Sequence, residues 1–151
     1  MAKSKTVTKS LSKAKSSSPG IMLVFMFLIT MLVSAVVLYG ANNMSPLQVV
    51  LGNQSLSLFW ALVLSSGVIA LVTTFVFPFI SDFSAQMKHM LSPMEMMAVF
   101  LVVNFATVWL MSRVSQVFGL GISSWLVVLI VSIVLDVVQG AAMMLVEGMK
   151  S

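Results

Sequence analysis

The stretch Ile21–Gly40 reads IMLVFMFLITMLVSAVVLYG, and it decides the class of fold. The run carries no charge and has the length of roughly 20 residues that an α-helix needs to cross the hydrocarbon core of a bilayer. The apolar core of a cleaved signal peptide is shorter, at about 7–15 residues. We therefore expect a transmembrane helix that is retained in the mature protein.

The composition of the whole chain leads to the same class. Of its 151 residues, 60% are hydrophobic and 8% are charged, and the mean hydropathy is +1.11. Soluble domains carry about 25% charged residues, so this chain has too few charges to cover a water-exposed surface. The sequence predicts an integral membrane protein whose surroundings are the lipid bilayer.

Three further apolar stretches follow the first one. The four predicted spans cover about 21–40, 58–80, 93–118 and 122–146. They predict an all-α membrane domain over residues 21–146, built as two helical hairpins that form a four-helix bundle, with 147–151 as a short C-terminal segment. Ser92-Pro93-Met94-Glu95 marks the start of the third span as a capping box with proline at the first helical position.

Basic residues are concentrated in the first 20 residues, MAKSKTVTKSLSKAKSSSPG. This tail is rich in Lys and Ser and holds no acidic residue, so we expect it to be disordered. Lysines beside the first span predict a cytoplasmic N-terminus, and four spans return the C-terminus to the same side. The same lysines are expected to contact anionic lipid headgroups. The sequence thus predicts a multi-pass protein of the cytoplasmic (inner) membrane.

The segments that connect the predicted spans indicate their structure less clearly than the spans do. The inner loop at 81–92 is predicted to form a short interfacial helix, because its apolar residues share one helical face: Phe83, Met87, Met90 and Leu91. The outer connections, at 41–57 and 119–121, hold no charge and are expected as a loop and a short turn. Asn43-Met44-Ser45 and Asn53-Gln54-Ser55 in the outer loop match the glycosylation sequon.

Asp136 lies in the middle of the fourth span, within SIVLDVVQG at Ser132–Gly140. An aspartate at a helix centre costs about 2.5–3.5 kcal/mol on insertion, whereas each Leu or Ile contributes about 0.3–0.6 kcal/mol in the opposite direction. The span therefore tolerates Asp136, yet an intramembrane acid marks a functional site by default. Counting residues from the outer ends places Asn104, Thr73 and Thr74 at the same depth, where each can hydrogen-bond a carboxyl group.

Arg113 is a second charged residue inside a predicted span. We expect it about 13 Å from Asp136 along the bundle axis, with the two side chains leaning toward each other. The alternative is that Arg113 extends outward to the headgroups. On the fourth span, Ser132, Asp136, Gln139 and Gly140 recur at helical spacing as one polar stripe. The predicted intramembrane polar cluster consists of Asp136, Asn104, Arg113, Thr73, Thr74, Ser132 and Gln139.

Three interpretations of this cluster remain open. It holds helices together by interhelical hydrogen bonds, or it handles protons or ions, or it forms a polar face against another subunit. The chain has no cysteine and one histidine, His89, so sites built on cysteine are excluded, and neither a cofactor nor a nucleic-acid partner is expected. The 14 methionines are expected to serve as packing, with a metal-trafficking motif as the alternative.

Two runs in the third and fourth spans resemble a known family. Phe100-Leu101-Val102-Val103-Asn104-Phe105-Ala106 and Ser124-Trp125-Leu126-Val127-Val128-Leu129 resemble the four-span phage-holin-like membrane proteins, the so-called superfamily IV. Phe59-Trp60-Ala61-Leu62 matches at the start of the second span, and the resemblance covers roughly Met44–Val138. It implies two hairpins, with pore formation or an association with envelope stress as the activity.

The sequence as a whole predicts a small membrane protein that acts through helix–helix association. We expect a holin-like or accessory subunit that forms a homo-oligomer or belongs to a membrane complex. No enzymatic activity is expected, because His89 has no catalytic partner visible in the sequence. The alternative function is a proton- or ion-coupled carrier, or a pore, that uses Asp136.

Overall fold

The computed structural model describes residues 18–149, apart from the side chain of residue 147. Most of the predicted basic tail and the last two residues lie outside this range. The described chain contains four long helices, which are α1 (Pro19–Met44), α2 (Leu58–Met87), α3 (Pro93–Arg113) and α5 (Trp125–Gly148). A single-turn helix, α4 (Ser115–Phe118), and two short strands, β1 (Val49–Leu51) and β2 (Leu120–Ile122), complete it.

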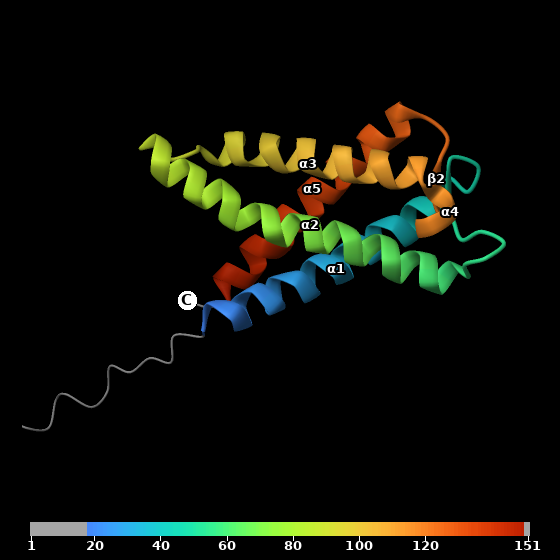
Figure 1. Cartoon of the computed structure of the whole chain (residues 1–151), viewed down its shortest axis with the longest axis horizontal. Helices are drawn as coiled ribbons and strands as arrows, with labels where there is room; N and C mark the ends of the chain where they lie inside the picture. Colours follow the sequence, from blue (N-terminus) through green and yellow to red (C-terminus); the bar gives the residue numbers. More distant parts are fainter. Residues whose placement is uncertain (1–17, 150–151) are drawn as a thin grey trace, which may run out of the picture.

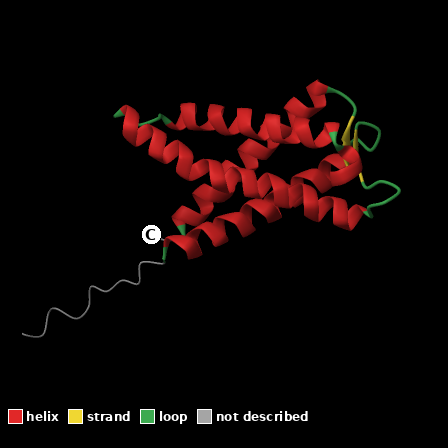
Figure 2. Cartoon of the chain, in the orientation of Figure 1, coloured by secondary structure: helices red, strands yellow, loops and turns green. Residues whose placement is uncertain are grey.

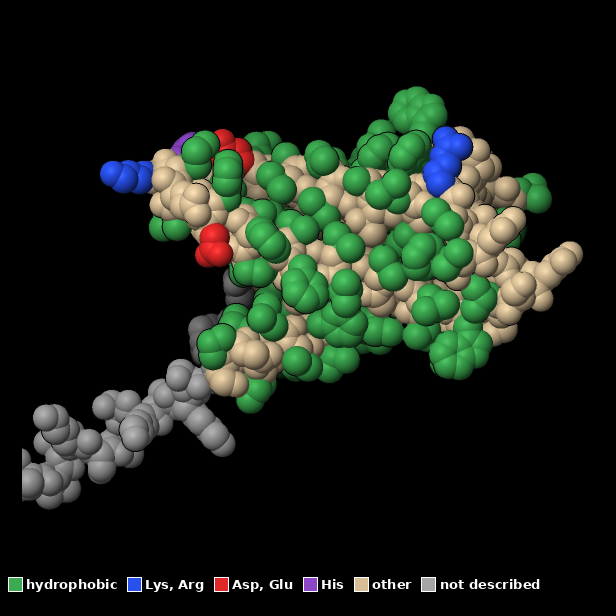
Figure 3. All heavy atoms as spheres, in the orientation of Figure 1, with side chains coloured by type: hydrophobic (Ala, Val, Ile, Leu, Met, Phe, Trp, Pro, Cys, Tyr) green, Lys and Arg blue, Asp and Glu red, His purple; other side chains and the backbone are tan. Residues whose placement is uncertain are grey.

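The four long helices are each apolar and long enough to cross a membrane. The predicted fold class is therefore confirmed: the protein is an all-α, multi-pass membrane protein with two helical hairpins, α1–α2 and α3–α5. Figure 3 shows hydrophobic side chains spread over the middle of the visible face, with charged side chains near its two ends. This distribution is typical of a surface that faces lipid along its middle.

The long helices form a ring in which α1 packs against α2, α2 against α3, α3 against α5, and α5 against α1. In Figure 1, α3 runs along the upper part of the bundle, α1 and α2 cross each other below it, and α5 passes behind α2. We name the end that carries the strands the sheet end, and the end where α1 begins and α5 finishes the terminal end. The buried apolar core lies mainly toward the sheet end and includes Leu38, Leu51, Ile69, Val108, Leu120, Val128 and Leu135.

At the sheet end, the two connections pair as a small antiparallel sheet, drawn in yellow in Figure 2. Leu51 lies opposite Leu120 in the register, and both side chains are buried in the core. The short turn expected at 119–121 is therefore wrong. Gly119 ends α4 with a φ of +70°, and the chain continues as a strand because β1 offers it a partner. For this reason α5 begins at Trp125 rather than at residue 122.

The loop after β1 is fixed to the sheet end by one side chain, Asn53. Its Nδ2 donates hydrogen bonds to the backbone carbonyls of Ser115 (3.2 Å) and Gln116 (3.1 Å). Its Oδ1 accepts hydrogen bonds from the backbone N–H groups of Ser55 and Leu56, both at 2.8 Å. The amide that the sequon match offers for glycosylation is thus already engaged in four hydrogen bonds.

Two other predicted boundaries differ from the structure. The third span ends at Arg113 rather than at residue 118, because Val114 leaves the helical conformation (φ −109°, ψ 41°). At the terminal end, no separate interfacial helix forms: residues 81–87 are the last turns of α2, which ends where Lys88 takes a φ of 52°, and Met90 and Leu91 lie in the connection to α3. By contrast, the capping box is confirmed: Ser92 and Glu95 exchange side chain–backbone hydrogen bonds of 3.3 and 2.7 Å.

Candidate functional site

A chain of hydrogen-bonded side chains crosses the bundle and joins all four long helices. Gln139 on α5 stands at its centre: its Nε2 donates to Ser34 Oγ on α1 (3.1 Å), and its Oε1 accepts from Asn104 Nδ2 on α3 (3.2 Å). Thr73 Oγ1 on α2 lies 3.5 Å from Asn104 Oδ1 and also donates to the Ile69 carbonyl at 2.8 Å. We name these four side chains the four-helix network.

Each side chain of the four-helix network is at most 5% exposed. Groups buried at this depth in a membrane have no water to bind, so their hydrogen bonds must be made within the protein. A helix turns by about 100° per residue, and a shift of one residue would carry any of these side chains away from its partner. The network therefore fixes how each of the four helices is rotated about its own axis.

Three of the four network residues belong to the polar cluster that the sequence predicts. The sequence places Asp136 opposite Asn104, whereas in the structure Gln139 takes that position. Ser34 is absent from the predicted cluster. Its signal in the sequence is spacing, because Thr30, Ser34 and Leu38 recur every four residues and are the buried residues of α1.

Asp136 lies beside the network, on the wall of a pocket of about 210 Å³ between α2, α3 and α5. The side chain is partly exposed, and it makes no hydrogen bond or ion pair with any residue in the described range 18–149. We name this space the Asp136 pocket. Its lining comprises Thr73, Phe77, Pro93, Met96, Met97, Phe100, Asp136, Gln139, Gly140, Met143 and Met144.

Arg113 forms no ion pair with Asp136 within residues 18–149 and has the exposed position of the alternative interpretation, in which it extends outward. Arg113 is the last residue of α3 and is exposed, with its guanidinium carbon 5.1 Å from the centre of the Trp109 ring. The early end of α3 thus brings Arg113 to the sheet end of the bundle.

The remaining two members of the predicted cluster stand outside the network. Ser132 is fully buried, but its Oγ donates to the Val128 carbonyl of its own helix at 2.7 Å. Thr74 Oγ1 is buried and has no hydrogen-bond partner among the described residues. Both side chains are close to network residues in the sequence, yet neither connects two helices.

Pockets lie at both ends of the bundle: one of about 380 Å³ lies at the sheet end between α1, β1 and α5, and the others lie in the terminal half. Besides the Asp136 pocket, a pocket of about 510 Å³ lies between the end of α2 and the α2–α3 connection, and one of about 80 Å³ lies between α1, α2 and α5. Phe77 lines all three pockets. The helices separate toward this end in Figure 1, and Figure 3 shows a notch in the surface there.

The described residues do not form a metal site built from His, Cys, Asp or Glu side chains. Within residues 18–149, no group of three or more His, Cys, Asp or Glu side chains is placed to hold a metal ion. The chemistry that the pockets offer comes from one carboxyl group, the amides and hydroxyls beside it, and many thioethers. Comparisons of the chain with protein-family models, with curated proteins and with solved structures found no match.

Proposed function

We propose that the protein is a small, non-enzymatic accessory subunit that binds a transmembrane helix of a partner at the Asp136 pocket. The observation that supports this function is the contrast between Asp136 and its neighbours. Asn104 and Gln139 are paired within the chain, whereas Asp136 has no partner within residues 18–149. An intramembrane carboxyl group normally has a partner, and here another chain is proposed to supply it.

The walls of the Asp136 pocket suit a helix as the occupant. A Cβ atom added at Gly140 would meet no atom within 4 Å, so the α5 backbone is open to a close approach. Small residues at such points let two membrane helices pack with their backbones near each other. Met96 and Met97 border the same pocket, and methionine side chains adapt to different partner surfaces. A second copy of this chain and another subunit both fit this description.

The test uses the absence of cysteine, which makes any introduced thiol unique. Met97, which is 46% exposed and lines the Asp136 pocket, is replaced by cysteine for cross-linking in native membranes. The matched control is Leu32→Cys on α1, because Leu32 is 68% exposed and does not line that pocket. We expect a cross-linked product from Met97→Cys and little from Leu32→Cys.

The role of the carboxyl group is then tested in the Met97→Cys background. Asp136→Leu removes the hydrogen bond, and an interhelical hydrogen bond of about 0.6–1.7 kcal/mol corresponds to a roughly 3- to 20-fold loss of association. Asp136→Asn keeps hydrogen-bonding capacity and should retain most of the product. Equal cross-linking at both cysteine positions, or no response to Asp136→Leu, would refute the proposal.

A second candidate function is a proton- or ion-coupled carrier or pore that uses Asp136. It is supported by the position of this partly exposed carboxyl group on the wall of a pocket of about 210 Å³. If the protein is a carrier, Asp136→Asn should abolish the flux of protons or ions in proteoliposomes while the variant stays folded. In a separate test, a cysteine introduced by Asp136→Cys should react with a membrane-impermeant thiol reagent from one side of the membrane. Protection from both sides, together with unchanged flux, favours the accessory subunit.

A further inference from the structure

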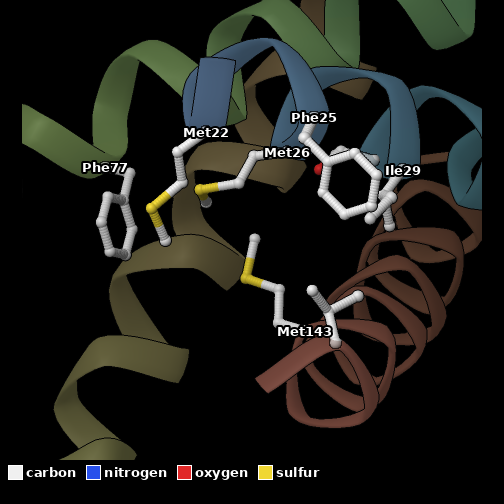
Figure 4. A pocket seen from close by; sticks show the side chains of 8 residues that line it. Met22, Phe25, Met26, Ile29, Phe77 and Met143 are labelled. Atoms are coloured by element: carbon white, nitrogen blue, oxygen red, sulfur yellow. The ribbon is translucent and has the colours of Figure 1, made fainter. Parts of the chain in front are cut away.

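The smallest of the three pockets in the terminal half, of about 80 Å³, collects thioether groups from two helices. Its lining is Met22, Phe25, Met26, Ile29, Thr30, Phe77, Met143 and Val146. Met22 and Met26 are four residues apart, so they share one face of α1, and Met143 comes from α5. Figure 4 shows the side chains of all three methionines directed toward the same space, with their sulfur atoms around it.

Three converging thioethers form a ligand set for a soft metal ion. Thioether and thiolate sulfur select Cu(I), whereas Mg²⁺ and Ca²⁺ require oxygen ligands. The described residues offer these harder ions no group of His, Asp or Glu side chains. We propose that Met22, Met26 and Met143 bind a soft monovalent cation, Cu(I) or its chemical analogue Ag(I), between α1 and α5.

The surroundings of the three sulfur atoms support a cation over simple packing. Methionines that serve as packing fill gaps, whereas these three border an unfilled space of about 80 Å³. Phe25 and Phe77 stand beside that space, and aromatic rings attract cations.

A negative charge is also close to the proposed site. Phe77 and Met143 line the Asp136 pocket as well, so the two pockets are direct neighbours. Charges inside a bundle are screened far less than charges in water, and the Asp136 carboxylate would therefore offset the charge of a monovalent ion. The sulfur atoms themselves are neutral, which suits an ion of charge +1 better than a divalent one.

The experiment is a competition for Cu(I) between the purified full-length protein in detergent, kept under reducing conditions, and a chromogenic Cu(I) chelator such as bicinchoninate. We expect the wild type to withdraw one Cu(I) per chain. Met22→Leu, Met26→Leu and Met143→Leu should each weaken binding by roughly 10–100-fold, since losing even a residue that only supports a metal ligand has that effect. The triple variant should withdraw none.

The matched control is a second triple variant, with Met96, Met97 and Met144 replaced by leucine. These methionines line the Asp136 pocket and not the proposed site. Leucine and methionine have similar volumes, so both triple variants should fold, and the control should bind Cu(I) like the wild type. Equal losses in the two triple variants, or no withdrawal by the wild type, would overturn the proposal.

X-ray absorption of the Cu(I)-loaded wild type gives a second readout that does not depend on the folding of any variant. Three thioethers predict sulfur as the only nearest neighbour of the copper, and oxygen or nitrogen neighbours alone would overturn the assignment. The metal site and the partner site are tested separately, because cross-linking at Met97→Cys is measured without copper.

Discussion

Replacement of Gln139 by leucine gives the sharpest test of the four-helix network. Leucine keeps the apolar bulk but removes the hydrogen bonds to Ser34 and Asn104, which link α5 to α1 and α3. An interhelical hydrogen bond in a membrane protein contributes about 0.6 kcal/mol on average and up to about 1.7 kcal/mol. The two lost bonds alone therefore lower the free energy of unfolding by about 1–3 kcal/mol.

A further loss arises at Asn104, whose Nδ2 has no other hydrogen-bond partner in the described part of the chain. Leaving such a donor buried and unpaired costs about 1–3 kcal/mol. The Ser34 hydroxyl is spared this penalty, because a serine within a helix can donate to the carbonyl four residues earlier. We expect Gln139→Leu to lower the free energy of unfolding by about 2–6 kcal/mol in total.

The measurement is reversible unfolding in mixed micelles with increasing dodecyl sulfate, followed by far-UV circular dichroism. The matched control is Ser132→Ala on the same helix, since Ser132 is equally buried but bonds only within α5; its effect should stay below about 1 kcal/mol. Asn104→Leu combined with Gln139→Leu should be less destabilising than the sum of the two single changes by about 1 kcal/mol or more, because no amide is left unpaired. A Gln139→Leu effect no larger than that of Ser132→Ala, or additive single changes, would refute the reasoning.

Three further predictions concern single residues. Asn53→Ala removes four hydrogen bonds at the sheet end, so limited proteolysis of the loop after β1 should become several times faster while the helical content stays unchanged. Gly119→Ala should destabilise the protein by about 2–4 kcal/mol, because the residue has a φ of +70° and its new Cβ would lie 2.5 Å from that of Ala61. Gly121→Ala, whose Cβ would meet nothing closer than 4.0 Å, should change unfolding in dodecyl sulfate by less than about 0.5 kcal/mol. Ser92→Ala should cost about 1 kcal/mol in the same assay through loss of the capping box.

The number and nature of the spans follow from the sequence because they depend on sums over many residues. Hydrophobic length is such a sum, and a local pattern such as the capping box at Ser92 is equally readable. The pairing of the two strands, by contrast, cannot be predicted from the sequence. β1 and β2 have three residues each and stand far apart in the sequence, so neither contains a pattern of its own, and each is a strand only because the other is present.

For the candidate site too, some features can be predicted from the sequence and others cannot. Depth in the membrane can be counted from the sequence, and it places Asn104 and Thr73 at the same level, where the two side chains lie 3.5 Å apart. Rotation of a helix about its axis cannot be counted in this way, because it is set by packing against three other helices. Gln139 rather than Asp136 therefore faces Asn104, and the convergence of Met22, Met26 and Met143 becomes visible only in the folded bundle.

The strand pair at the sheet end also has a consequence for biogenesis. A chain that leaves the ribosome and enters the membrane in order completes α1, β1 and α2 long before β2 exists. During that interval the edge of β1 and the Nδ2 of Asn53 lack the partners that β2 and α4 later provide, so the first hairpin stays incomplete. Closure of the sheet becomes possible only when α3, α4 and β2 have followed, and α5 is the element that completes the bundle after it. Translation that stops before β2 would leave a membrane-inserted chain in which β1 has no strand to pair with. Such a chain would be exposed to the proteases that remove incomplete proteins.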